Sequence, residues 1–118
     1  MTDITPYLNQ LDILSDTAKQ AVKDFGMVGL EIQFSGNTEN AYSELFSQIL
    51  PLIEKLQTEN FQNFYSLMYR IDISEGQIKQ AVEESKDKSF SEIVTDLILK
   101  RELLKVVTKR SYSAGKKL

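Results

Sequence analysis

The sequence predicts an all-α protein, a compact antiparallel bundle of about five helices, and three observations support this fold class. Apolar residues recur at steps of three and four along most of the 118-residue chain, which is the spacing of one helix face. Two capping-box patterns mark helix starts, and only one stretch alternates like a strand. The length fits one domain, expected at residues 1–111, with residues 112–118 as a flexible basic tail.

The first two helices are expected at residues 6–25 and 38–57. Thr5 can cap the first helix, and Gly26 can end it, because glycine readily takes the left-handed conformation that follows many helices. Pro51 lies inside the second helix. Its ring removes one backbone hydrogen bond, so we expect a kink there.

Three more helices are expected at residues 61–71, 75–86 and 90–110. The fourth follows a Ser-x-x-Gln capping box that begins at Ser74, and the fifth follows a Ser-x-x-Glu box that begins at Ser89. These boxes satisfy backbone N–H groups that the first helical turn leaves without partners. They therefore fix both helix starts.

The corner between the third and fourth helices has apolar spacing similar to that of a helix-turn-helix, a DNA-binding motif. Asp72 stands where such turns usually have glycine. The helix after the turn carries more acidic than basic side chains and would repel phosphate. We interpret the corner as a structural turn in which Ile73 and Ile78 pack across the cap.

The segment 28–34 alternates strictly between apolar and other residues, which is the strand pattern. A lone strand leaves its backbone groups unpaired. The segment therefore pairs with a second copy in a dimer, lies as an extended arm across the helices, or alternates by accident. Four apolar residues form the candidate partner-binding set: Val28, Leu30, Ile32 and Phe34.

Charge is distributed unevenly along the chain. Residues 1–99 carry a net charge of −9 and residues 100–118 a net charge of +6. The candidate basic patch consists of Lys105, Lys109, Arg110, Lys116 and Lys117. It could contact nucleic acid or an acidic partner. Cations at this end also suit the negative end of the last helix dipole, and this interpretation is favoured.

Arg70 lies among apolar residues and is expected to pair with an acid on a neighbouring helix. Asp72, Asp96 and Glu102 are the candidate partners. The alternative is that Arg70 holds a buried anionic ligand.

The composition argues against several classes of function. The chain has no cysteine and no histidine, so thiolate nucleophiles, disulfides, and the commonest metal ligand and general base are missing. We predict no catalytic residue, no metal site and no cofactor. No signal peptide and no apolar run of membrane-spanning length is recognised.

These observations predict a small non-enzymatic protein of the cytoplasm, an interaction or structural protein that acts as a homodimer. Its expected partner is itself or another protein, and no membrane is expected. The alternative is a nucleic-acid-associated factor that uses the basic C-terminal helix and tail.

Overall fold

The computed structural model describes residues 10–113 and confirms an all-α fold in which five helices pack together. No strand occurs in this range. The helices are α1 (Leu11–Met27), α2 (Ala41–Glu59), α3 (Phe61–Ile71), α4 (Glu75–Glu84) and α5 (Phe90–Ser113), with one 3-10 turn, η2 (Thr38–Asn40), before α2.

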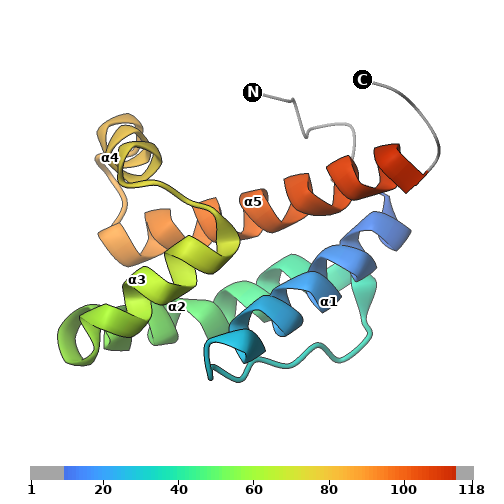
Figure 1. The fold of residues 1–118 in the computed structure, drawn as a ribbon, viewed down its shortest axis with the longest axis horizontal. Coiled ribbons are helices and arrows are strands. Elements are labelled where there is room, and N and C mark those ends of the chain that lie inside the picture. Colours follow the sequence, from blue (N-terminus) through green and yellow to red (C-terminus); the bar gives the residue numbers. More distant parts are fainter. Residues whose placement is uncertain (1–9, 114–118) are drawn as a thin grey trace.

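The long helix α5 lies along both α1 and α2 and runs opposite to them (Figure 1). The extended connection after α1 returns the chain along the bundle, so α1 and α2 run in the same direction (Figure 1). The short helix α3 runs back along α2, and α4 packs against α5 at one end of the molecule. The main core lies where α1, α2, α3 and α5 meet, and its largest fully buried apolar side chains are Phe25, Leu45, Ile49, Ile53, Leu67, Ile71, Val94 and Ile98.

The ends of α1 differ from the prediction. Gln10 is extended, so the helix begins at Leu11, and the predicted cap at Thr5 lies outside the described residues. At the other end the helix continues through Gly26. Gly29 takes φ +78°, and the N–H groups of Gly29 and Leu30 donate to the carbonyls of Gly26 and Phe25. This is a Schellman motif, so the helix-ending glycine is Gly29 rather than Gly26.

The junction between α2 and α3 is a single residue. The helix α2 runs through Pro51 and ends at Glu59, two residues past the predicted end at residue 57, so a kink at Pro51 stays a prediction. Asn60 leaves the helical conformation, and its Oδ1 accepts a hydrogen bond from the N–H of Asn63 at 3.2 Å. Asn60 thus ends one helix and caps the next.

The corner after α3 is closed by the backbone itself. Asp72 adopts a left-handed conformation with φ 70°, and the N–H of Ile73 donates to the carbonyl of Met68 at 2.9 Å. The capping box predicted at Ser74 is confirmed, as is the box at Ser89. Ile73 is buried, and Ile78 packs on the main core. A structural turn therefore explains Asp72, the capping box at Ser74, and the apolar residues Ile73 and Ile78.

The alternating segment 28–34 begins in the turn that ends α1, at Val28 and Gly29, and continues from Leu30 as an extended arm along the helices (Figure 1). Side chains of α2 pair with the backbone at the end of this arm, at Gln33 and at the following Ser35. The Gln48 amide accepts from the N–H of Gln33 at 2.8 Å and donates to its carbonyl at 2.7 Å, and Glu44 accepts from the N–H of Ser35 at 3.0 Å. A side-chain amide offers one donor and one acceptor, as a neighbouring strand does. The arm therefore satisfies part of its backbone within one chain.

Candidate functional site

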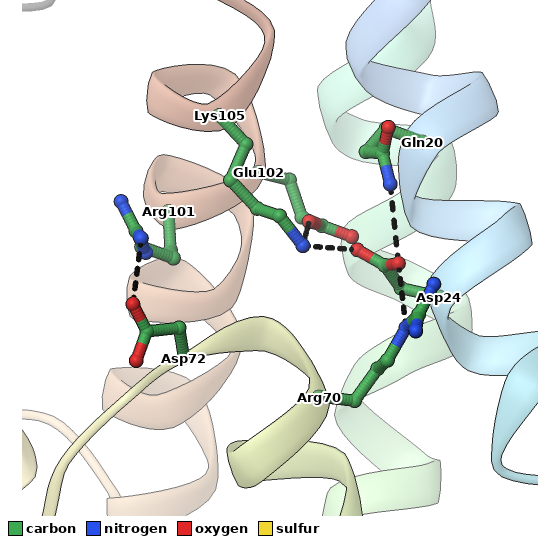
Figure 2. Close-up of polar contacts among 7 residues, drawn as sticks. All are labelled: Gln20, Asp24, Arg70, Asp72, Arg101, Glu102 and Lys105. Carbon is green, nitrogen blue, oxygen red and sulfur yellow. Dashed lines mark hydrogen bonds and ion pairs between the residues drawn. The ribbon is translucent and has the colours of Figure 1, made fainter. Parts of the chain in front are cut away.

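Two fully buried carboxyl groups lie together where α1, α3 and α5 meet (Figure 2). Asp24 belongs to α1 and Glu102 to α5, and both are 0% exposed. Asp24 accepts hydrogen bonds from three side chains: Lys105 Nζ at 2.8 Å, Arg70 Nε at 3.1 Å and Gln20 Nε2 at 3.1 Å. Charges are rarely buried to this degree unless they are paired, and Asp24 is paired with two cations.

The two carboxyl groups have opposite protonation preferences. As a carboxylate, Glu102 has no hydrogen-bond donor in range, and Lys105 Nζ lies 3.6 Å from its Oε1. Burial, with the neighbouring Asp24, raises the pKa of Glu102 to about 8. Burial acts to raise the pKa of Asp24 too, but hydrogen bonds from Glu102, Lys105 and Gln20 outweigh it and lower that pKa below its ordinary value. At neutral pH Glu102 is therefore mostly a carboxylic acid that donates to ionised Asp24.

This cluster holds three helices together and gives a bound molecule no direct approach to its carboxyl groups. Arg70 and Lys105 are partly exposed and cover the carboxyls from outside. Within residues 10–113, no group of three acidic side chains is arranged to hold a metal ion. The pair Arg101–Asp72, at 3.0 Å, adds a second link from α5 to the end of α3 (Figure 2).

The sequence contains a signal for this buried cluster, although the cluster was not predicted from it. Asp24 follows Ala21 by three residues in the apolar stripe of α1, and Glu102 lies four residues from both Ile98 and Val106. An acid at an apolar stripe position on each of two helices is the signal. The predicted ion pair of Arg70 exists, but its partner is Asp24 and not Asp72, Asp96 or Glu102.

The outer side of α3 exposes aromatic side chains. Tyr69 is 90% exposed, and Phe61 and Tyr65 are each about half exposed. These three residues are four apart and lie along one side of the helix. A shallow hollow beside them is lined by Val28, Gln62, Tyr65, Ser66, Tyr69 and Arg70. We call Phe61, Tyr65, Tyr69 and the hollow residues together the α3 face.

The four apolar residues of the arm are directed largely into their own chain. Ile32 is 2% exposed and belongs to the main core, and Val28, Leu30 and Phe34 are partly buried against it. Val28 also lines the hollow of the α3 face. A role of these four residues in partner binding stays a prediction, and Val28 is the one that the structure places beside an exposed aromatic surface.

The residues of the predicted basic patch have different surroundings in the structure. Lys105 pairs with Asp24, and Arg110 pairs with Asp12 at 2.7 Å and Asp16 at 2.6 Å. Lys109 is exposed, whereas Lys116 and Lys117 lie outside the described residues. A hollow between α1 and α5 adds two lysines that the sequence did not indicate, and its lining is Asp16, Lys19, Gln20, Lys23, Val106, Lys109 and Arg110.

Comparisons with known proteins give no family for this chain: no protein-family model, no curated protein and no solved structure matches it. In the part of the chain that the structure describes, no helix combines the length and the apolar character needed to cross a membrane.

Proposed function

We propose that this protein is a small non-enzymatic interaction protein that forms a homodimer through the α3 face. The observation that supports this proposal most strongly is that Tyr69, in a stripe of three aromatic residues, is 90% exposed. Aromatic residues are enriched at protein interfaces, where they supply a large contact area at low entropic cost. The absence of cysteine suits the reducing cytoplasm, where we place this role.

The charge of the α3 face favours a second copy of the same chain as the occupant. Residues 60–69 include no charged residue, although a quarter of the whole chain is charged. Two acidic chains repel each other, and this uncharged stripe, which has only the cation Arg70 beside it in the lining of the hollow, is where they can approach at least cost. An oppositely charged partner would find little to pair with along this stripe.

The exposed aromatic area is compatible with a moderate interface. Three aromatic side chains, half to nine-tenths exposed, offer roughly 300–450 Å². That is about half of what each partner contributes to a standard interface. Met27, which precedes Val28 in the chain, is 63% exposed. The polar side chains Gln62 and Ser66 supply more contact area.

The direct test replaces the aromatic stripe with charge. The double variant Tyr65→Lys/Tyr69→Lys should give a monomer by light scattering at concentrations where the unchanged chain is a dimer. The control is Leu11→Lys on α1, which charges an apolar residue about as exposed as Tyr65 and should leave the dimer intact. A dimer that survives the double variant, with both chains folded by circular dichroism, would refute the α3 face as the interface.

A second candidate function is association with nucleic acid through the hollow between α1 and α5. The observation that favours it is the gathering of Lys19, Lys23 and Lys109 around that hollow, in a chain that is acidic as a whole. Three phosphate contacts would give a binding constant that falls with salt. Electrophoretic shift of a single-stranded RNA, lost on changing all three lysines to Gln, supports this function, and no shift at low salt refutes it.

A further inference from the structure

We infer that the two copies pack with their α3 helices antiparallel, and that Glu59 of each copy pairs with Arg70 of the other. This inference rests on the proposed homodimer and adds its register, its orientation and a charged contact. It starts from the placement of the two residues on either side of α3 along the chain: Glu59 ends α2 just before α3 begins, and Arg70 lies near the end of α3. Glu59 is exposed at the end of α2, one residue before the Asn60 cap, and Arg70 lies one residue before the end of α3.

Arg70 has binding capacity left on the α3 face. Its Nε donates to buried Asp24 at 3.1 Å, and no partner within the described residues accepts from its two terminal nitrogens. The side chain is 36% exposed and lines the hollow beside Tyr65 and Tyr69. A guanidinium presents five N–H donors in a fixed fork, so one edge can hold Asp24 while the other takes a second carboxylate.

The lining of the hollow contains no acidic residue that could fill this position from the same chain. The acid nearest in sequence, Asp72, is paired with Arg101 at 3.0 Å. Glu59 has no ion-pair partner among the described residues. Each copy therefore carries one incompletely paired cation and one unpaired acid at the two ends of α3.

A two-fold axis near Tyr65 and Ser66 places these ends together. With a rise of 1.5 Å per residue, Phe61 and Tyr69 lie about 6 Å on either side of Tyr65. An antiparallel partner then sets Phe61 of one copy against Tyr69 of the other and brings the start of α3, with Glu59, beside Arg70. A parallel arrangement would set Arg70 beside Arg70 and Glu59 beside Glu59. Like charges at an interface are disfavoured, so the antiparallel arrangement is preferred.

The arrangement connects the interface to the buried cluster. A carboxylate held by Arg70 from outside sits on the opposite edge of the guanidinium from Asp24. The proposed pairs are partly exposed and occur twice in a symmetric dimer. Losing both should weaken the dimer roughly tenfold.

Disulfide trapping tests the register, because the chain has no cysteine of its own. Ser66→Cys lies next to the axis and should cross-link with itself under mild oxidation. Gln62→Cys alone should not, since its two copies would lie about 10 Å apart along the helices, beyond the separation that a disulfide bridges. A mixture of Gln62→Cys and Tyr69→Cys chains should cross-link. Self-linking of Gln62→Cys, with no cross-link between a Gln62→Cys chain and a Tyr69→Cys chain in the mixture, would overturn the antiparallel arrangement.

The ion pair is tested by Glu59→Lys, which should weaken the dimer at least tenfold in sedimentation equilibrium. The control is Glu54→Lys, an exposed acid earlier on α2, which should change the constant by less than about twofold. Equal effects of both variants would overturn the Glu59–Arg70 contact. The oligomeric state of the unchanged chain distinguishes the two proposals. If the unchanged chain is a monomer, the homodimer itself is refuted, whereas a dimer with the wrong cross-links refutes only the antiparallel geometry.

Discussion

Arg70 on α3 donates a hydrogen bond from Nε to Oδ1 of Asp24 on α1, at 3.1 Å, across 46 residues of sequence. The same carboxylate accepts from Lys105 on α5 through its other oxygen, at 2.8 Å. One buried acid thus connects three helices. Because Arg70 also lines the hollow of the α3 face, the internal cluster and the proposed interface share a residue.

Replacing Asp24 with Asn should destabilise the fold by about 2 kcal/mol. The amide keeps the shape of the side chain but leaves Arg70 and Lys105 without their counter-charge. Urea unfolding measures the change in the free energy of unfolding. The control Asp12→Asn alters an exposed acid that shares Arg110 with Asp16, and it should cost at most about 0.5 kcal/mol. Equal effects of the two variants would contradict a structural role for the buried acid.

Glu102 should make stability fall as the pH rises from about 5 to 8. Its pKa in the folded chain is about 8, against an ordinary 4.5, so the folded state holds a proton in this range that the unfolded state has lost. The free energy of unfolding should fall by up to about 1.4 kcal/mol per pH unit. Above pH 8 the contribution is constant, because both states are then ionised.

The variant Glu102→Gln should remove this slope, since an amide does not titrate. Glu92→Gln is the control: the hydrogen bond from the Ser89 backbone lowers the pKa of Glu92, so its contribution is lost only as the pH falls below about 4.5. Thermal unfolding at a series of pH values distinguishes the two. A slope that persists in Glu102→Gln would show that another group is responsible.

Asp72→Gly should stabilise the corner by about 0.5–1 kcal/mol. Asp72 is held at φ 70°, a conformation that glycine adopts without steric cost. The lost pair with Arg101 is worth little, because the Asp72 side chain is 82% exposed. Asp72→Ala loses the same pair but keeps the Cβ, so it should be destabilising. If both variants lower the denaturation midpoint equally, the ion pair outweighs the backbone conformation.

Ile32→Ala should destabilise the chain by about 2–4 kcal/mol. Ile32 is 2% exposed within the main core, so the truncation leaves a cavity. Leu11→Ala, at a half-exposed position, should cost less than about 0.5 kcal/mol and serves as the control. An effect of Ile32→Ala as small as that of Leu11→Ala would mean that the arm is detached in solution. The expected cost also means that charged substitutions in the arm would test folding before they tested dimerisation.

Much of the fold could be predicted from the sequence because its signals are local. Apolar spacing located the five helices, and the boxes at Ser74 and Ser89 fixed two helix starts. The end of α1 was wrong by a few residues, because two glycines lie close together and only the chain path decides that Gly29 turns. The strand-like alternation in the arm indicated which of its side chains are buried. The partners of its backbone are side chains of another helix, Gln48 and Glu44, and the alternation does not identify them.

The buried cluster and the lysine-lined hollow could not be derived in this way, because they depend on which helices meet. Arg70 pairs with an acid 46 residues away, and Arg110 reaches Asp16 across 94 residues. A charged residue on an apolar stripe indicates that a partner exists and leaves its identity open. The exposure of Tyr69 depends likewise on the tertiary arrangement, in which no helix of residues 10–113 covers this side chain.

Sedimentation equilibrium of the intact, unmodified chain at micromolar concentrations distinguishes a homodimer from a monomer. We expect a reversible monomer–dimer equilibrium in which the average mass approaches twice the 13.5-kDa chain mass as the concentration rises. A mass of 13.5 kDa at every concentration, into the high micromolar range, would contradict the claim that the α3 face joins two copies.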